Sequence, residues 1–305
     1  MSAAAALSDP VFRAYVGIVL GVLIVAGAVL ALLQFVFHIE QGSIWKTYRS
    51  WRWMVPLAVA MIFAGRAPFI IGVTALALLG FKEFALVSGL VRDRWLTGVI
   101  YAGIVMVGIA SLTRTSLTGV AVSVLALILF LPILRNAARG VVQRMSLGVV
   151  AFLYLGWMFG HLGFFANATN ASGYLCYLIF ATEVNDVSGF TFGKIFGRHP
   201  LRSAISPRKT WEGALGALAV SMALPWMLRF SFPFFGPWQL LLAGLIVGIG
   251  APLGDLSISV IKRDLGAKDW GAAIPGHGGI LDRIDSLIFV APLFMLMTEY
   301  YYPGR

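Results

Sequence analysis

Apolar residues run almost unbroken along this 305-residue chain, interrupted by short polar segments. Stretches of about 20 apolar residues have the length of a helix that crosses a bilayer. Because the runs are continuous rather than alternating, an all-α polytopic integral membrane protein with about 9–10 transmembrane helices is expected, not a β-barrel. The pattern predicts spans at residues 11–37, 53–65, 67–90, 95–112, 117–134, 145–166, 173–191, 212–232, 237–257 and 284–303.

The segment that links the first two spans admits two interpretations. If residues 38–53 are helical, Ile44, Tyr48 and Trp51 share one face, which is typical of a helix lying in the membrane interface. An ordinary cytoplasmic loop with interfacial aromatic residues is the alternative. The span at 53–65 is short and is followed by Arg66 and Pro68, so both a full span and a re-entrant half-helix fit it.

Basic residues are divided unequally between alternating loops, with seventeen on one side and five on the other. Loops rich in lysine and arginine stay on the cytoplasmic side. A location in a bacterial-type inner (cytoplasmic) membrane is therefore expected, with loops 192–211 and 258–285 facing the cytoplasm. Ten full spans would place both termini outside, whereas a re-entrant segment at 53–65 would move the N-terminus inside.

Composition narrows the function classes. Only 12% of the residues are charged, against roughly 25% in soluble domains. The formal charge of +10 is explained by the excess of basic residues in cytoplasmic loops, so no nucleic-acid partner is expected. Basic residues on that side would also attract anionic lipid and anionic nucleotides. The single cysteine, Cys176, excludes an internal disulfide framework and a cysteine-based zinc site.

Acidic residues concentrate in the second half of the chain, where nine of thirteen occur from residue 183 onward. This asymmetry predicts an N-terminal transmembrane scaffold, 1–170, and a C-terminal catalytic transmembrane domain, 171–305. Glu183 and Asp186 lie near the inner end of an apolar span, where a carboxylate needs a cation. Arg208 and Lys209 precede the next span, and its N-terminus would favour a phosphate. A capped helix after a basic loop is the simpler interpretation of those two residues.

The stretch from Asp255 to Asp285 departs most from the apolar background. If it begins as a helix, Asp255, Ser259 and Lys262 lie on one face, and Asp282 shares a face with Asp285. Converging carboxylates repel one another unless a cation lies between them, and oxygen ligands suit Mg²⁺. Nearby basic side chains could neutralise charge that develops on a transferred phosphate, namely Lys262, Arg263 and Lys268.

Two residues of this stretch have simpler interpretations. Asp264 lies between basic neighbours at helical spacing, which favours an internal ion pair. His277 stands alone in a Pro-Gly-His-Gly-Gly run, so a zinc site there is improbable. A hydrogen bond to a phosphate or carboxylate fits His277 better, and general acid catalysis on the leaving group is a further option.

These residues resemble the signature of the integral membrane CTP:phosphatidate cytidylyltransferases, or CDP-diacylglycerol synthases. That signature is Ser-x-apolar-Lys-Arg, four residues, Lys-Asp, and a run that ends in His-Gly-Gly-x-x-Asp-Arg-x-Asp. The Ser-Pro-x-Lys-Thr-Trp-Glu-Gly box also occurs, from Ser206 to Gly213. The resemblance covers roughly residues 180–290. The signature is present here as Ser259, Lys262, Arg263, Lys268, Asp269, His277, Gly278, Gly279, Asp282, Arg283 and Asp285.

The resemblance implies an enzyme of phospholipid biosynthesis that makes CDP-diacylglycerol and pyrophosphate from CTP and phosphatidic acid. The lipid phosphate would attack the α-phosphate of CTP. Asp255, Asp282 and Asp285 would hold Mg²⁺, with K⁺ as a second cation beside it, and a homodimer is implied as well. Catalytic roles fall to Asp255, Asp282, Lys262 and His277, and substrate binding to Asp186, Ser206, Arg208, Lys209, Ser259, Arg263, Lys268, Asp269 and Arg283.

Two departures mark a divergent member. The family commonly has Gly-Asp-Leu-x-Glu-Ser before its signature, and Ile258 replaces the glutamate here. The Asp-Ser/Thr-Gly-Ala-Tyr box is altered after Asp186. Two other functions stay open: a CTP-dependent polyprenyl-lipid kinase or cytidylyltransferase, which needs the same nucleotide site, and a non-catalytic lipid-binding or transport paralogue, because intramembrane charges also line transport paths.

Overall fold

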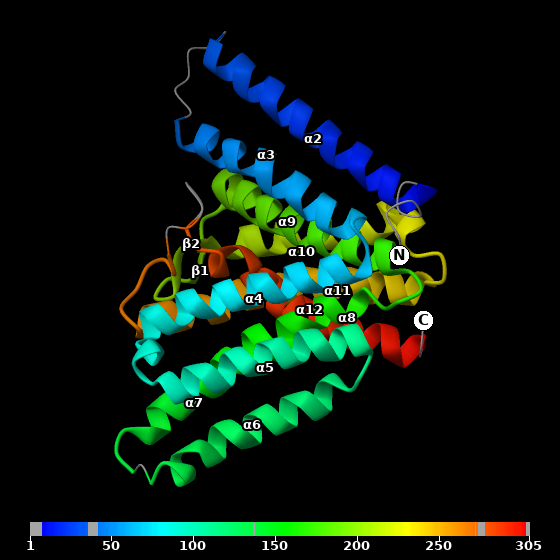
Figure 1. Ribbon diagram of the computed structural model, residues 1–305. Helices are drawn as coiled ribbons and strands as arrows, with labels where there is room; N and C mark the ends of the chain where they lie inside the picture. The colour runs from blue at the N-terminus through cyan, green and yellow to red at the C-terminus, as the bar shows by residue number, and fades with distance from the viewer. Residues whose placement is uncertain (1–7, 36–41, 137, 272, 274–277, 303–305) are drawn as a thin grey trace.

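The computed structural model describes residues 8–35, 42–136, 138–271, 273 and 278–302 (Figure 1). Long helices dominate it, as the sequence predicts. The helices are α2 (Pro10–Phe35), α3 (Gly42–Phe63), α4 (Arg66–Ser88), η1 (Leu90–Arg92), α5 (Arg94–Thr113), α6 (Leu117–Leu134), α7 (Val141–Ala151), η2 (Phe152–Met158), α8 (Phe159–Phe165), α9 (Ala171–Phe196), α10 (Trp211–Met227), η3 (Arg229–Ser231), α11 (Pro237–Asp264) and α12 (Leu281–Tyr301).

Six helical segments of the described chain are long and apolar enough to span a membrane. The other long helices, α3, α9, α10 and α12, run alongside them, and α2 begins at the end of the bundle where α12 ends (Figure 1). This arrangement agrees with an even number of crossings. The six segments are Pro10–Leu32, Arg66–Ser88, Arg94–Thr113, Leu117–Leu134, Val141–Phe165 and Pro237–Asp264.

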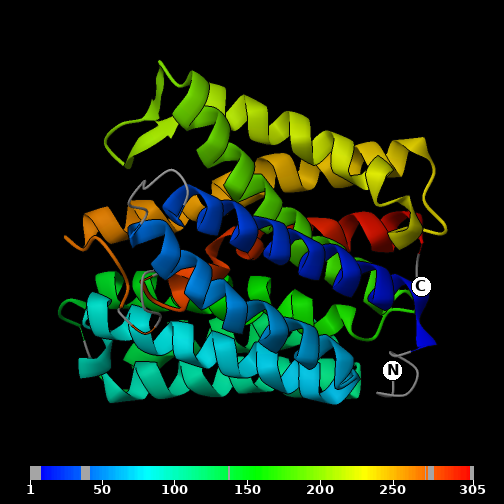
Figure 2. The same ribbon diagram turned by 90° about the horizontal axis from the view of Figure 1, so that it is seen from above.

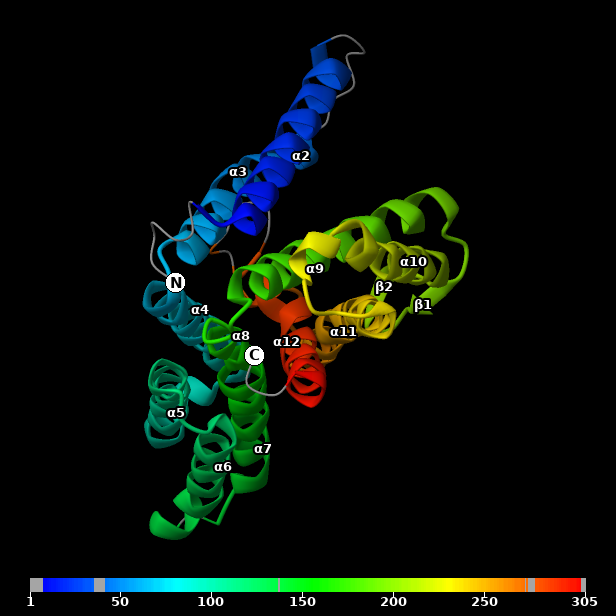
Figure 3. The same cartoon turned by 90° about the vertical axis from the view of Figure 1, so that its right-hand side faces the viewer.

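The helices form two groups. Figure 3 shows α4 to α8 in one group and α9 to α12 in the other, with the α2–α3 pair leaning away from both. Seen from above in Figure 2, α9 and α10 lie on the opposite face from α4 and α5. Helix α12 contacts α11, α8, α9 and α4, so it is the element that joins the groups.

The structure decides between the two interpretations of the segment before the second span. Residues 42–63 form one continuous helix, α3, so the short span at 53–65 is neither a half-helix nor preceded by a separate interfacial helix. The first proline after Gly42 is Pro56, so nothing earlier interrupts the backbone hydrogen bonds. Arginines such as Arg49 and Arg52 can extend their charged ends toward the interface along an apolar helix.

The expected all-α fold also contains a small β-hairpin. Strand β1 (Pro200–Arg202) pairs antiparallel with β2 (Ser206–Thr210) inside the predicted cytoplasmic loop 192–211. Thr210 ends the hairpin and caps α10, because its hydroxyl accepts a hydrogen bond from the backbone N–H of Gly213 at 3.2 Å. The hairpin therefore leads directly into the next helix.

Aromatic side chains close the bundle at the end far from the hairpin. Tyr177 of α9 packs edge-on against Phe232 at a centroid distance of 4.7 Å, and Phe232 stacks on Phe235 at 4.8 Å. Phe294 of α12 contacts the same cluster. This fully buried group fixes one end of α9 and α12 and leaves their opposite ends to form the polar cavity.

Candidate active site

A polar cavity of about 190 Å³ lies between α9, α11, α12 and the segment before α12. Six carboxylates and two cationic side chains line it, which is a large excess of negative charge at the end of a membrane bundle. All eight residues come from the second half of the chain, as expected from the distribution of acidic residues. They are Glu183, Asp186, Asp255, Lys262, Asp269, Asp282, Arg283 and Asp285.

Helix α11 supplies one wall of this cavity. It continues to Asp264, seven residues beyond the predicted end of the span at 257, so Asp255, Ser259 and Lys262 do share one face. The Ser259 hydroxyl donates a hydrogen bond to Oδ1 of Asp255 at 3.1 Å. Because their polar groups are paired with one another and with α12, these residues can remain helical inside the protein.

Close contact between α11 and α12 brings the two acidic segments together. A Cβ at Gly254 would lie 3.2 Å from Cα of Ser286 and would clash with the Asp285 carbonyl oxygen. Only glycine permits this approach, which places Asp255 and Asp285 on the same cavity. Ser286 then bridges neighbouring carboxylates: its N–H donates to Asp285 Oδ1 at 2.8 Å and its hydroxyl donates to Asp186 Oδ2 at 3.1 Å.

Two lysine–carboxylate pairs border the cavity. The ammonium of Lys262, which is 7% exposed, lies 2.6 Å from Oδ1 of Asp282. The other oxygen of Asp282 accepts backbone N–H bonds from Trp270 at 3.1 Å and Gly279 at 3.0 Å. Lys209 of β2 lies 2.5 Å from Oδ2 of Asp255. Each pair places a cation where an anionic substrate could displace the carboxylate.

The β-hairpin positions Lys209. Arg263, near the end of α11, donates from Nε to the Ile205 carbonyl oxygen at 3.2 Å and so holds the turn between the strands. At the base of the hairpin the His199 ring lies 2.5 Å from Oε1 of Glu212. This hydrogen bond, with backbone N–H bonds to the same carboxylate, lowers the pKa of Glu212 to about 2.

A carboxylate from the first half of the chain holds the start of α12 in place. Glu83 of α4 accepts N–H bonds from Ile280 and Leu281, both at 2.9 Å, at the start of α12. The adjacent Phe84 stacks on Trp270 at a centroid distance of 5.1 Å. Glu83 is not among the predicted site residues, although a lone carboxylate inside an apolar span was a usable signal. The predicted scaffold, 1–170, therefore contributes to the site.

The predicted site residues fall into three sets. Those on the cavity are Asp186, Asp255, Lys262, Asp269, Asp282, Arg283 and Asp285, with Ser259 and Lys209 in contact with Asp255. Arg263 binds the hairpin, and Ser206, Arg208 and Lys268 lie outside the cavity lining. His277 lies outside the described residues. Their roles stay predictions.

Ile258 does not create a gap in the cavity. Its side chain is 1% exposed and belongs to the hydrophobic core. The isoleucine that replaces the usual glutamate is not among the residues that line the cavity.

The donor set of the cavity suits a hard divalent cation, because six carboxylates face two cationic groups. Within the described chain, however, no group of three or more His, Cys, Asp or Glu side chains is close enough to hold a metal ion as it stands. Asp282 is already engaged by Lys262 and two backbone N–H groups. Residues 255 and 285, with Asp186 beside them, are the better-placed donors.

The cavity also contains an unpaired donor. The guanidinium nitrogen Nε of Arg283 is buried and has no hydrogen-bond partner among the described residues. A buried N–H without a partner costs roughly 1–3 kcal/mol, so an anionic ligand that accepts this bond would gain from it. The cavity thus combines carboxylates for a cation with donors for an anion, which is the arrangement that a metal-bound phosphate requires.

Comparison of the sequence with known proteins identifies relatives of this chain. Residues 45–301 match the cytidylyltransferase family, so the similarity extends well beyond the stretch recognised in the sequence. The chain is 40% identical over 149 residues to a phosphatidate cytidylyltransferase of Staphylococcus haemolyticus and 39% identical over 149 residues to one of Staphylococcus aureus. Each alignment covers 48% of this chain and 56% of the relative. The uncharacterized protein YnbB of Escherichia coli is 30% identical over 278 residues, which is 85% of this chain and 88% of that protein.

Proposed function

Because this chain belongs to the cytidylyltransferase family, we propose that it transfers the cytidylyl group of CTP to the phosphate of phosphatidic acid. The products are CDP-diacylglycerol and pyrophosphate. The chain spans just over half the length of the staphylococcal phosphatidate cytidylyltransferases that it resembles. Because the similarity covers only part of those relatives, support for this reaction has to come from the site residues of this chain.

One observation carries the proposal: the cavity places the cations of two lysine–carboxylate pairs and the unpaired Arg283 N–H around a cluster of carboxylates. Lys262 and Lys209 are each held within 2.6 Å of a carboxylate oxygen. Nucleotidyl transfer depends on positioning and charge neutralisation, and it needs no nucleophile from the protein. A cluster of this composition suits a triphosphate that arrives with its counter-cation.

In the proposed reaction an oxygen of the phosphatidate phosphate attacks the α-phosphorus of CTP. A new P–O bond forms, the bond between the α-phosphorus and the bridging oxygen breaks, and that oxygen leaves with pyrophosphate. Lys262, Lys209 and Arg283 bind the phosphate oxygens and stabilise the charge that develops on them. Each lysine exchanges its carboxylate partner for a phosphate, so the charge that it faces is never left unbalanced.

We further propose that Asp255, Asp285 and Asp186 bind Mg²⁺, with Asp282 as a fourth donor once Lys262 turns to the substrate. Bound there, Mg²⁺ would neutralise phosphate charge and activate the α-phosphorus toward attack. K⁺ as a second cation and a homodimer stay predictions from the resemblance. The bacterial-type inner (cytoplasmic) membrane stays a prediction too, as does a cavity that opens to the cytoplasm, where CTP is found.

The test is turnover of radiolabelled CTP by purified protein in detergent with phosphatidic acid, with and without Mg²⁺. Mg²⁺-dependent formation of CDP-diacylglycerol and pyrophosphate is expected. Lys262→Met should reduce turnover at least about 100-fold, since removal of one preorganised donor commonly has that effect. Lys194→Met is the matched control, because Lys194 is exposed on α9 and lies outside the cavity lining.

Three outcomes would overturn the proposal. Binding of CTP without turnover of phosphatidic acid would indicate another acceptor, and lipid phosphate with CDP as products from a polyprenol would identify a kinase. Folded protein that neither binds nor turns over CTP would favour a non-catalytic lipid-binding or transport role.

A further inference from the structure

A second pocket lies in the first half of the chain, away from the catalytic cavity. It has a volume of about 50 Å³ and is formed where α5 begins, α6 ends and α7 begins. A site for one water needs on the order of 10–15 Å³ by the same measure, so this pocket has room for the oxygens of one phosphate group. Its lining is Asp93, Leu96, Ile128, Leu131, Pro132, Arg135, Val141, Arg144 and Met145.

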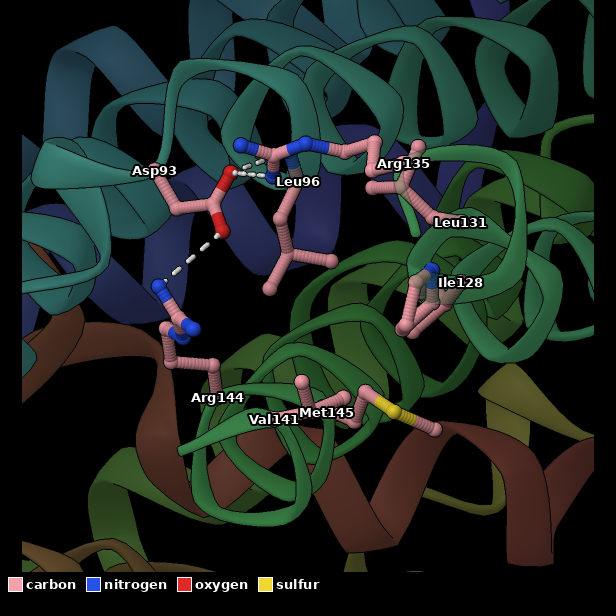
Figure 4. A pocket seen from close by; sticks show the side chains of 9 residues that line it. Asp93, Leu96, Ile128, Leu131, Arg135, Val141, Arg144 and Met145 are labelled. Carbon is pink, nitrogen blue, oxygen red and sulfur yellow. Dashed lines mark hydrogen bonds and ion pairs between the residues drawn. The ribbon is translucent and has the colours of Figure 1, made fainter. Parts of the chain in front are cut away.

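Asp93 holds two arginines at the mouth of this pocket. Figure 4 shows Arg135 and Arg144 reaching Asp93 from different sides, with nitrogen–oxygen distances of 2.7 Å and 3.7 Å. The Asp93 side chain is only 9% exposed, whereas the arginine side chains are 38% and 46% exposed. Asp93 is also the N-cap of α5, so its position is fixed by the helix. The carboxylate therefore orients two guanidinium groups that still face outward.

Arg135 keeps unused donors toward the outside. Its NH1 nitrogen donates to Asp93, while no partner is found for its Nε and NH2 nitrogens in the described chain. Arg144 is held more firmly, because Nε and NH2 donate to the carbonyl oxygens of Gly140 and Arg139. A planar guanidinium with two free N–H groups is suited to a phosphate oxygen pair.

The surroundings of the pocket are strongly positive. Arg92, Arg94 and Arg139 lie on the same connections, so these segments carry five arginines and one carboxylate, Asp93, a formal excess of four positive charges. Only two of the five are paired with Asp93. A charge excess of this size at a membrane surface attracts anionic headgroups, by about 1 kcal/mol for each basic residue near the surface.

Apolar side chains place the pocket at the level where headgroups meet hydrocarbon. Trp95, Leu134 and Val142 are 67%, 73% and 78% exposed, and each lies next to the pocket on one of its three helices. Exposed apolar side chains at the ends of three membrane-spanning segments are expected to contact lipid. Inside the pocket, Leu131 and Met145 continue this apolar surface inward from the arginines.

We propose that this pocket binds the headgroup of an anionic glycerophospholipid from the surrounding bilayer, at a site distinct from the catalytic cavity. The lipid phosphate accepts hydrogen bonds from Arg135 and Arg144, and the start of an acyl chain lies along Leu131 and Met145. Asp93 preorganises the arginines and prevents them from turning into water. The site lies at the end of the bundle that carries the β-hairpin, so both lipid sites face the same leaflet (Figure 1).

Native mass spectrometry of the detergent-purified protein tests this proposal with phosphatidylglycerol and phosphatidylcholine as probes. The wild type should retain one phosphatidylglycerol that is absent from the double variant Arg135→Gln/Arg144→Gln. The apparent affinity should fall at least about tenfold, as expected when a charge-assisted hydrogen bond is lost. Arg139→Gln, which removes one positive charge from the same connection but does not line the pocket, should retain the lipid.

A second variant keeps the test decisive if the double variant does not fold. Met145→Trp fills the pocket and leaves every charge in place, so it should also release the lipid. Equal binding of phosphatidylcholine, equal loss in Arg139→Gln, or retention of the lipid in both pocket variants would overturn the proposal. Displacement of the lipid by millimolar inorganic phosphate would overturn the choice of a lipid and leave only a phosphate site.

Discussion

Replacement of Glu83 by glutamine would test whether the first half of the chain fixes the start of α12, which borders the proposed active site. In the wild type each carboxylate oxygen of Glu83 accepts one backbone N–H, from Ile280 and from Leu281, both at 2.9 Å. Glutamine has the same shape but only one acceptor oxygen. Its NH₂ group would face an N–H donor and leave that donor without a partner.

The expected cost follows from these two contacts. A hydrogen bond to a charged group contributes roughly 1.5–3 kcal/mol, and the substitution removes one such bond and makes the other neutral. The negative charge at the N-terminus of α12 is also lost, which costs about 0.3–1 kcal/mol more. A local destabilisation of about 2–3 kcal/mol is therefore expected at the start of α12.

Hydrogen exchange measures this effect without any assumption about function. A cost of about 2–3 kcal/mol corresponds to roughly 30- to 160-fold faster exchange in a peptide that contains Ile280 and Leu281, while peptides of α5 and α6 keep their protection. Glu299→Gln is the matched control, because Glu299 is exposed near the other end of α12. Unchanged exchange in the Glu83→Gln variant would refute the role assigned to Glu83.

Three further predictions concern single contacts. Asp282→Asn should abolish CTP turnover while the protein still inserts and folds, and retained turnover in a radiolabel assay would exclude Asp282 from the machinery. Gly254→Val should lower the free energy of unfolding by about 1–3 kcal/mol or more through overpacking, and the unfolding temperature should fall with it. Gly98→Ala, where a Cβ meets nothing within 4 Å, should not lower the unfolding temperature. Because the pKa of Glu212 is lowered to about 2, its contact with His199 should persist above pH 4.5 and be lost as the pH falls toward 2. Carboxyl carbon NMR of glutamate-labelled protein would follow that titration, and an unperturbed Glu212 there would contradict the contact.

The sequence was sufficient for the membrane class and for most helices, because long apolar runs have few alternative structures. It was insufficient where charged residues continue a helix. α11 extends to Asp264 because the Lys262 ammonium finds Asp282 20 residues further along the chain, and hydropathy cannot detect such a partner. The helical start of α3 was only one of two interpretations for a related reason, since its basic residues are also typical of a loop.

The site was predicted in composition but not in pairing. Spacing along a helix correctly placed Asp255, Ser259 and Lys262 on one face, and it grouped Asp282 with Asp285. It could not show that Lys209 would reach Asp255 from a β-hairpin, because a contact between distant segments is set by how the helices pack. It also could not show that Ile258 is buried in the hydrophobic core.

Glu83 shows why the division into scaffold and catalytic half is too simple. Its carboxylate lies within a mostly apolar helix, and its nearest partners are backbone N–H groups almost 200 residues away. Gly271 and Gly279 pack against it so closely that a Cβ at either position would lie within 3 Å of a carboxylate oxygen. Glycine at these positions is thus explained by Glu83. The segment that carries Asp282 is fixed from both halves of the chain, and its geometry depends on how α4 packs against α12.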